Sequence, residues 1–137
     1  MTHTKLPDIE DTEENEDITF GYDNFLEVKP IVIEHLHKHK VSSVTVMYSG
    51  GNDEGGPDKV KVLFRDGTDI DISNYHYENL YDALCTPVYY EYSGFAMEGH
   101  ANGEIRWVIN YEDKEKSKVL LTGSQSYEHW EAVDKEL

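Results

Sequence analysis

The stretch from Ser43 to Ser73 constrains the fold most, because apolar and polar residues alternate along it in three successive runs. Successive side chains of a strand point to opposite faces of a sheet, so each run predicts a strand with one apolar face. Asp66-Gly67 separates the last two runs and favours a type I′ hairpin turn. We therefore predict three antiparallel strands, with apolar faces formed by Val44, Val46, Tyr48, Val60, Val62, Phe64, Ile70 and Ile72.

Helices are predicted on both sides of this stretch. Apolar residues between positions 25 and 36 fall on one helical face, and Pro30 fits there only in a first turn or at a kink. Residues 74–92 repeat apolar side chains every three or four positions, while Pro87 favours a break or kink near Cys85. Both segments have the amphipathic pattern of helices that cover one face of a sheet.

The C-terminal third supplies further strands. Residues 104–111 and 118–124 alternate like strands and should form a second hairpin, and residues 126–137 have the spacing of a short closing helix. We predict that Trp107 and Leu84 belong to the core. The fold class follows: α+β, with an antiparallel sheet of about five strands and two main helices packed on one face, in the order α-β-β-β-α-β-β.

The N-terminus differs in composition from the rest of the chain. Residues 1–17 contain one base, Lys5, and no aromatic residue. Their acids are Asp8, Glu10, Asp11, Glu13, Glu14, Glu16 and Asp17. A segment with this composition repels itself and buries little, so we predict an acidic flexible tail over residues 1–17 and a single domain over residues 18–137.

The net charge of the chain limits the classes of molecule that it is expected to bind. Asp and Glu total 28 against 12 Lys and Arg, which gives a net charge of −16. This balance disfavours direct binding to nucleic acid or to an anionic membrane, and it favours a basic protein as partner. A second interpretation is that the acidity only maintains solubility. The single cysteine and the polar N-terminus predict a cytoplasmic protein, and no motif predicts a cofactor.

The glycine-rich stretch 49–58 is predicted to be an irregular loop, because four glycines and a proline interrupt regular structure. It carries Asp53, Glu54 and Asp58, but it lacks the ligand spacing of an EF-hand and the GK[ST] ending of a phosphate loop. The loop is longer than a hairpin requires, which favours a contact site.

Two motifs resemble those of a known family. YSGGNDEGGPDKV and the later GHANGEIRWVINY are similar to the paired signature of a family of small uncharacterised proteins from phages and other mobile elements. The first motif departs from the family's Ser-Gly-x-Gly-Asp-x-Gly pattern at Asn52. The second matches at Gly99, Gly103, Glu104, Ile105 and Trp107. The resemblance implies a shared fold and no established activity.

Catalytic and metal-binding interpretations are weaker. Cys85 lies beside Leu84 on a predicted helix, where a buried and inert thiol is usual. His35 and His39 have a spacing suitable for metal ligands, but a solvated basic helix end is the preferred interpretation, and we predict no metal site. A small hydrolase or ligand-degrading enzyme that uses His100 and the acidic loop is the alternative from a different class.

The sequence therefore favours a binding function. We hypothesise an acidic protein that inhibits a nucleic-acid-handling enzyme or a defence effector by covering its basic surface. It would act as a phage anti-defence or DNA-mimic protein, or as an immunity protein or antitoxin, and its oligomeric state is left open. The predicted contact residues are Asp53, Glu54, Asp58, Asp69, Asp71, Tyr89, Tyr90 and Tyr92. The tyrosines form an aromatic cluster suited to core or interface packing.

Overall fold

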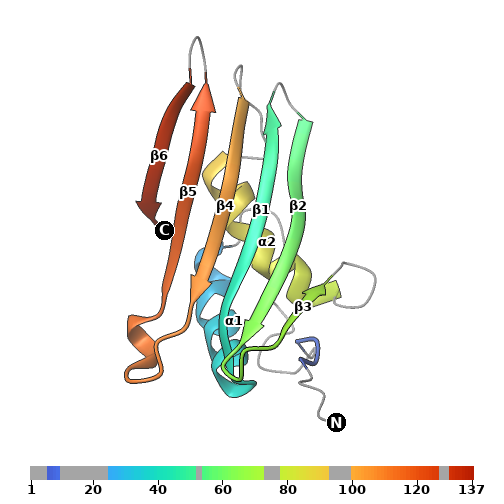
Figure 1. Ribbon diagram of the computed structural model, residues 1–137, viewed down its shortest axis with the longest axis vertical. Helices are drawn as coiled ribbons and strands as arrows, with labels where there is room; N and C mark the ends of the chain where they lie inside the picture. The colour runs from blue at the N-terminus through green and yellow to red at the C-terminus, as the bar shows by residue number, and fades with distance from the viewer. Residues whose placement is uncertain (1–5, 10–24, 52–53, 73–77, 93–99, 127–129) are drawn as a thin grey trace.

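The computed structural model describes residues 6–9, 25–51, 54–72, 78–92, 100–126 and 130–137. Its elements in chain order are α1 (Phe25–Lys38), β1 (Val41–Gly51), β2 (Glu54–Phe64), β3 (Asp69–Ile72), α2 (Glu78–Tyr92), β4 (His100–Val108), the 3₁₀ turn η2 (Lys114–Lys116), β5 (Lys118–Ser126) and β6 (Trp130–Glu136). The strands form one antiparallel sheet in the order β3-β2-β1-β4-β5-β6, and both helices lie on the same face of it (Figure 1). The predicted α+β class is confirmed, with six strands. Within the described residues, neither helix has the length and apolar content to cross a membrane.

The sixth strand replaces the short closing helix predicted for residues 126–137. Trp130–Glu136 pairs with β5 along its whole length. Val133 and Leu137 both pack against the core, and they are four residues apart. A spacing of four places two side chains on the same side of a helix and also on the same face of a strand. The predicted helix rested on the spacing of Tyr127, Trp130 and Val133, and pairing with β5 overrides that spacing because it gives this segment the hydrogen bonds of a strand.

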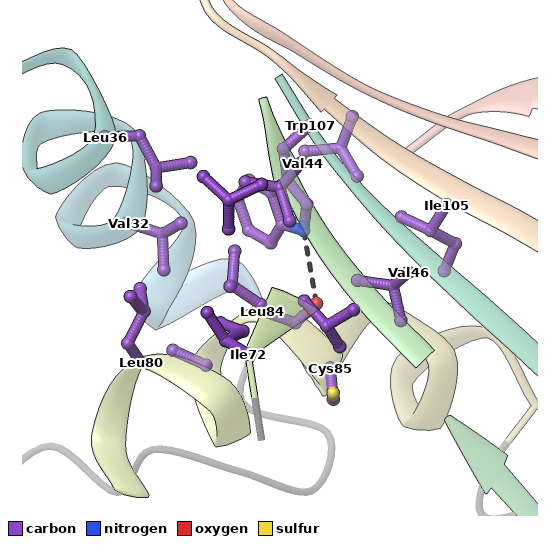
Figure 2. Close-up of a cluster of buried hydrophobic side chains, with 14 of the residues drawn as sticks. Val32, Leu36, Val44, Val46, Ile72, Leu80, Leu84, Cys85, Ile105 and Trp107 are labelled. Carbon is purple, nitrogen blue, oxygen red and sulfur yellow. Dashed lines mark hydrogen bonds between the residues drawn. The ribbon is translucent and has the colours of Figure 1, made fainter. Parts of the chain in front are cut away.

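One apolar core lies between the sheet and the two helices (Figure 2). Trp107 on β4 and Leu84 on α2 are fully buried, which confirms their predicted place in the core. The Trp107 indole N–H donates a hydrogen bond of 3.1 Å to the backbone carbonyl of Leu84. The strand residues predicted to face the helices are also buried, except for the half-buried Ile70. Alternation along each strand thus decides which face of the sheet meets the helices.

Both helices continue through an internal proline. Pro87 lacks the N–H that would bond the carbonyl of Ala83, four residues earlier. The buried Thr86 hydroxyl donates a 2.7 Å hydrogen bond to that carbonyl, so α2 does not break where the sequence predicts a break. In α1, Pro30 lies in the second turn, and both Pro30 and Leu26 are exposed. Water can therefore reach the Leu26 carbonyl that Pro30 leaves without a helix donor.

The hairpin predicted at Asp66-Gly67 joins β2 to β3, but its turn is not type I′. A type I′ turn needs positive φ at both central residues. Of these two residues, Gly67 alone has a positive φ, of 92°, and its N–H donates to the carbonyl of Phe64. The Asp66 carboxylate accepts hydrogen bonds from the backbone N–H and the hydroxyl of Thr68. An aspartate side chain therefore stabilises the turn in place of a second left-handed residue.

The stretch 49–58 is not the irregular loop that its glycines predict. β1 continues to Gly51 and β2 begins at Glu54, so the paired strands run through four glycines. β1 is also paired with β4 on its other side in this stretch. Pairing on both sides of β1 outweighs the weak strand preference of glycine. Pro57 is tolerated because β3 pairs with β2 only from Val60 onward, which leaves the proline on an edge.

The described part of the N-terminal segment, residues 6–9, packs on the helices. Its two apolar side chains are buried, and the Asp8 carboxylate accepts hydrogen bonds of 3.2 and 2.6 Å from the backbone N–H groups of Asn79 and Leu80. A carboxylate in this position caps the N-terminus of α2 and interacts favourably with the helix dipole. The flexible tail predicted for residues 1–17 thus differs from the structure at residues 6–9. The remainder of that tail lies outside the described residues.

Candidate functional site

The open face of the sheet is the starting point for a functional site. Both helices lie on one face, so among the described elements the opposite, outer face is uncovered (Figure 1). One end of the sheet extends past both helices. It contains the end of β1, the starts of β2 and β4, the end of β5 and the start of β6. The row Tyr48–Gly103–Gly123–Val133 crosses four neighbouring strands just before this end. We call the following residues the acidic end: the strand residues beyond the row, together with Pro57, which pairs with Tyr48, and Asp58, which lies at the adjacent β-bulge. They are 49–51, 54–58, 100–102, 124–126 and 130–132.

Charge is distributed unevenly along the sheet. The strand segments of the acidic end contain no Lys or Arg, and neither do residues 52–53 and 127–129, which connect them in the sequence and lie outside the described residues. The acids of these segments and connections are Asp53, Glu54, Asp58, Glu128 and Glu131. Cations gather instead around the turns at the opposite end of the strands, at Lys38, Lys40, Arg65, Lys114, Lys116 and Lys118.

A shallow depression of about 410 Å³ lies at the border of the acidic end. It is lined by Met47, Tyr48, Ser49, Asp58, Asn102, Gly103, Glu104, Thr122 and Gly123. Residues with two carboxylates, an amide and three hydroxyls therefore line it, and its described lining includes no cation. The Ser49 hydroxyl donates a 2.7 Å hydrogen bond to Oδ2 of Asp58. A lining rich in acceptors suits a cationic group of a binding partner.

Two glycines bring β4 and β5 close together at this depression. A Cβ atom on Gly103 would lie 2.3 Å from the carbonyl oxygen of Thr122, and one on Gly123 would lie 2.3 Å from the carbonyl oxygen of Asn102. The Tyr48 hydroxyl is 3.0 and 2.8 Å from these two positions, so the tyrosine covers the glycine pair. Any larger residue would have to displace backbone, and both positions therefore require glycine.

The predicted contact acids occupy different parts of the outer face. Asp58 lines the depression, whereas Asp69 and Asp71 lie exposed on the edge strand β3. The carboxylates of Asp69 and Asp71 are each 3.8 Å from an ammonium group, on Lys61 and Lys59 respectively. Exposed ion pairs contribute little to stability, but they reduce the local negative charge. Lysine side chains thus offset the negative charge of the β3 acids, whereas the described lining of the depression that contains Asp58 includes no Lys or Arg.

The predicted tyrosines lie on the other side of the sheet. Tyr89 and Tyr90 belong to α2, which covers the helix side of the sheet. Tyr89 is half-buried, and its hydroxyl is 3.2 Å from where a Cβ atom on Gly56 would lie. Tyr90 is 41% exposed, and its ring packs against Phe25 with 5.3 Å between centroids. Tyr89 therefore reaches Gly56 of the acidic end from the helix side of the sheet, whereas Asp58 lines the depression.

Three of the predicted contact residues have side chains that the structure does not describe. Asp53 lies outside the described residues. Glu54 and Tyr92 belong to β2 and α2, but their side chains are not described. Their inclusion in a contact surface therefore rests on sequence position: Asp53 and Glu54 by the β1–β2 hairpin end, and Tyr92 at the end of α2.

The described residues offer little support for catalysis. Cys85 is buried, as predicted, and burial raises the pKa of its thiol, which keeps it protonated and unreactive. The rings of His35 and His39 lie 4.7 Å apart, yet no group of three potential ligands among the described residues could hold a metal ion. His100 lies on β4, but its side chain is not described. The hydrolase alternative therefore stays a prediction.

The two motifs behind the family resemblance are neighbours in space. Tyr48 pairs with Gly103, and the pairing continues to Gly51 and His100. A scan against protein-family models finds no match, and searches of curated proteins and of solved structures find none either. The resemblance to the phage family therefore stays a prediction, and the register shows that the two motifs pair along β1 and β4.

Sequence reasoning missed Asn102, Glu104 and Thr122 as members of a site. Their signal was the distribution of cations along the chain. Lys and Arg are absent from positions 41–58, 66–105 and 119–134. The strand residues of the acidic end all come from these three segments. Without the strand order, nothing indicated that three separate cation-free segments would lie together.

Proposed function

We propose that this protein is an acidic inhibitor that binds a basic surface of a nucleic-acid-handling enzyme or of a defence effector through its acidic end. The uneven charge carries the proposal: the open end of the sheet has carboxylates and no Lys or Arg. Attraction between such a surface and a basic partner accelerates encounter, and short-range contacts then hold the complex.

The depression supplies the chemistry for one Lys or Arg side chain of the partner. Asp58 and Glu104 can accept charge-assisted hydrogen bonds, and the amide oxygen of Asn102 adds a neutral acceptor. Met47 is 47% exposed at the same place and offers apolar surface to the aliphatic part of a cationic side chain. Carboxylates on this end would occupy partner sites that otherwise receive phosphates.

Two biological roles are compatible with this chemistry. A phage anti-defence or DNA-mimic protein would bind a host enzyme that handles nucleic acid. An immunity protein or antitoxin would bind a basic toxin. The partner's identity distinguishes these roles, because both need the same acidic contact surface. Direct nucleic-acid binding through this end is disfavoured, since phosphate contacts require Lys and Arg.

The test begins with capture of the partner from host lysate on the immobilised chain, followed by measurements on the purified pair. The Asp58→Asn/Glu104→Gln variant removes two negative charges from the depression. The Asp69→Asn/Asp71→Asn variant removes two negative charges from β3 and serves as the matched control. Surface plasmon resonance then compares the affinities, and an assay of the partner's activity on nucleic acid, or of its toxic activity, measures inhibition.

We expect the depression variant to bind roughly tenfold more weakly, as the loss of charge-assisted contacts implies. The control variant should bind within about twofold of the parent, because its acids already have lysine partners. Raising the salt concentration should reduce the association rate more than it increases the dissociation rate. Equal binding by both variants and the parent would contradict the proposed surface, and an uninhibited partner would contradict the inhibitor function.

A further inference from the structure

A second pocket, of about 430 Å³, lies at the opposite end of the molecule from the acidic end. It is lined by His39, Lys40, Phe64, Arg65 and Asp66. These residues come from two turns, the α1–β1 turn and the β2–β3 turn. The Arg65 backbone N–H donates a 2.9 Å hydrogen bond to the Lys40 carbonyl, which holds the two turns together. Three cationic or titratable basic side chains thus meet in a protein whose net charge is −16.

Arg65 is held in place by an aromatic ring. Its guanidinium carbon lies 4.0 Å from the centroid of the Tyr111 ring. The Tyr111 hydroxyl donates a 2.6 Å hydrogen bond to the Val41 carbonyl, and the His37 ring stacks on Tyr111 with 4.7 Å between centroids. A stacked guanidinium keeps the N–H donors along its edge, and these match the oxygens of a phosphate or a carboxylate. Arg65 is therefore positioned before any ligand binds.

Lys40 adopts a backbone conformation that lysine rarely takes. Its φ is 61°, in the left-handed region, at the position after α1 where glycine is usual. Such residues persist where the surrounding structure holds them, and they concentrate at functional sites. A glycine would relieve the strain here, but it would also remove the ammonium group from the pocket.

The pocket cations are not the ones that form ion pairs among the described residues. Those pairs are Lys59–Asp71, Lys61–Asp69 and Lys114–Glu34. Asp66 lines the pocket, but its Oδ1 accepts two hydrogen bonds from Thr68 within its own turn. Positive charge at the end of α1 complements the helix dipole, which accounts for Lys38. It does not account for Arg65, which comes from a different turn and is fixed by Tyr111.

We propose that this pocket binds a phosphate group, either as free phosphate or as part of a phosphate ester. Arg65 would supply a bidentate fork, Lys40 a mobile ammonium group, and His39 a ring N–H. The pocket has room for more than a single phosphate, so a diphosphate or an ester fits within it. This site is separate from the acidic end and does not depend on the function proposed above.

Isothermal titration calorimetry at low salt tests the proposal with the full-length protein. The probes are inorganic phosphate, pyrophosphate and acetate, which separate one phosphate group from two and from a simple carboxylate. Arg65→Gln removes the guanidinium group, and Lys40→Gly removes the ammonium group together with the backbone strain. Lys59→Gln is the matched control, because it removes one positive charge about 17 Å along β2 from Phe64.

We expect saturable 1:1 binding of pyrophosphate, weaker binding of phosphate and no measurable binding of acetate. Arg65→Gln should weaken pyrophosphate binding roughly tenfold, while Lys59→Gln leaves it unchanged. Lys40→Gly should raise the thermal midpoint and still weaken binding, which separates loss of the ligand from loss of the fold. The absence of saturable binding would overturn the proposal. So would equal weakening by Lys59→Gln, which would indicate general charge effects, or Lys40→Gly and Arg65→Gln variants that bind like the parent.

Discussion

The carboxylate of Asp8 accepts a 2.6 Å hydrogen bond from the backbone N–H of Leu80, which lies 72 residues further along the chain. This contact attaches the acidic N-terminal segment to the first turn of α2. The side-chain amide of Asn79 also donates a hydrogen bond of 2.8 Å to the backbone carbonyl of Ile9. The N-terminus of this helix is thus satisfied by a distant residue, whereas most helix caps come from the preceding residue.

Replacement of Asp8 by Ala should lower the free energy of unfolding by about 1–2 kcal/mol, because two backbone N–H groups lose their acceptor. Asp8→Asn keeps an acceptor oxygen and should cost less. Urea unfolding of the three proteins measures the difference. The composition of residues 1–17 alone predicts that their removal leaves the free energy of unfolding unchanged, whereas the Asp8 contact predicts that it falls. Urea unfolding of the truncated protein distinguishes these two expectations. A truncated protein as stable as the parent would show that the Asp8 contact contributes nothing.

Trp107 should be among the most sensitive positions in the core. Trp107→Ala removes a fully buried side chain and should cost about 3–5 kcal/mol. Trp107→Phe retains most of the ring packing but loses the donor to Leu84, and it should cost about 1–2 kcal/mol. Denaturant midpoints, compared at equal m-values, give both numbers. A soluble Trp107→Ala protein with the parent's midpoint would refute the packing of β4 on α2.

Thr86 and Pro87 should be energetically coupled. Thr86→Val removes the donor to the buried Ala83 carbonyl and should cost about 1–3 kcal/mol. In a Pro87→Ala background the restored backbone N–H can bond that carbonyl, so the same Thr86 substitution should cost less. A double-mutant cycle measures this coupling free energy. Additive effects would mean that the threonine hydroxyl does not substitute for the missing N–H.

Gly123→Ala should destabilise the sheet more than a turn glycine substitution does. At Gly123 a Cβ atom would meet the backbone of β4, whereas at Gly67 a Cβ atom would have no neighbour within 4 Å. Gly67→Ala therefore carries only the penalty of positive φ, about 1 kcal/mol. Gly123→Ala should cost clearly more than that control. Thermal unfolding of both variants gives the comparison, and equal midpoints would contradict the close approach of β4 and β5.

Acid should weaken the fold through His35. Burial lowers the pKa of His35, although its hydrogen bond to the Pro7 carbonyl and the charge of Asp8 oppose the shift. A histidine with a depressed pKa binds fewer protons when folded than when unfolded. Its contribution to stability is therefore full above about pH 6.5 and is lost as the pH falls below that value.

Unfolding free energies of the parent and His35→Gln, measured between about pH 7.5 and about pH 5, test this contribution. The parent should lose more stability than the variant as the pH falls. Burial also lowers the pKa of His39. A second variant, His39→Gln, therefore shows how much of the remaining pH dependence of the unfolding free energy arises from that residue. Parallel profiles for the parent and His35→Gln would exclude a contribution from His35.

Local pattern was sufficient for much of the fold. Alternating residues such as Val44 and Val60 identified the central strands and their buried face, and the spacing around Leu84 identified α2. These predictions succeeded because side-chain direction repeats every two residues in a strand and every 3.6 in a helix. The predictions that failed include the irregular loop around Gly50, the break at Pro87 and the helix around Val133. At each of these positions the local preference was weak or unfavourable, and a contact with a distant or neighbouring residue determined the conformation.

By itself, the sequence determined the α+β class, the buried faces of the strands and the large negative charge. The tertiary structure alone decided how that charge is arranged. Strand order placed parts of three cation-free segments together at one end, put Asp58 and Glu104 in the lining of one depression, and set Lys61 and Lys59 against the acids of β3. It also joined Lys40 to Arg65 across two turns. Side-chain periodicity is a local property of the chain, whereas neighbours across a sheet depend on pairing between distant segments, which no local pattern encodes.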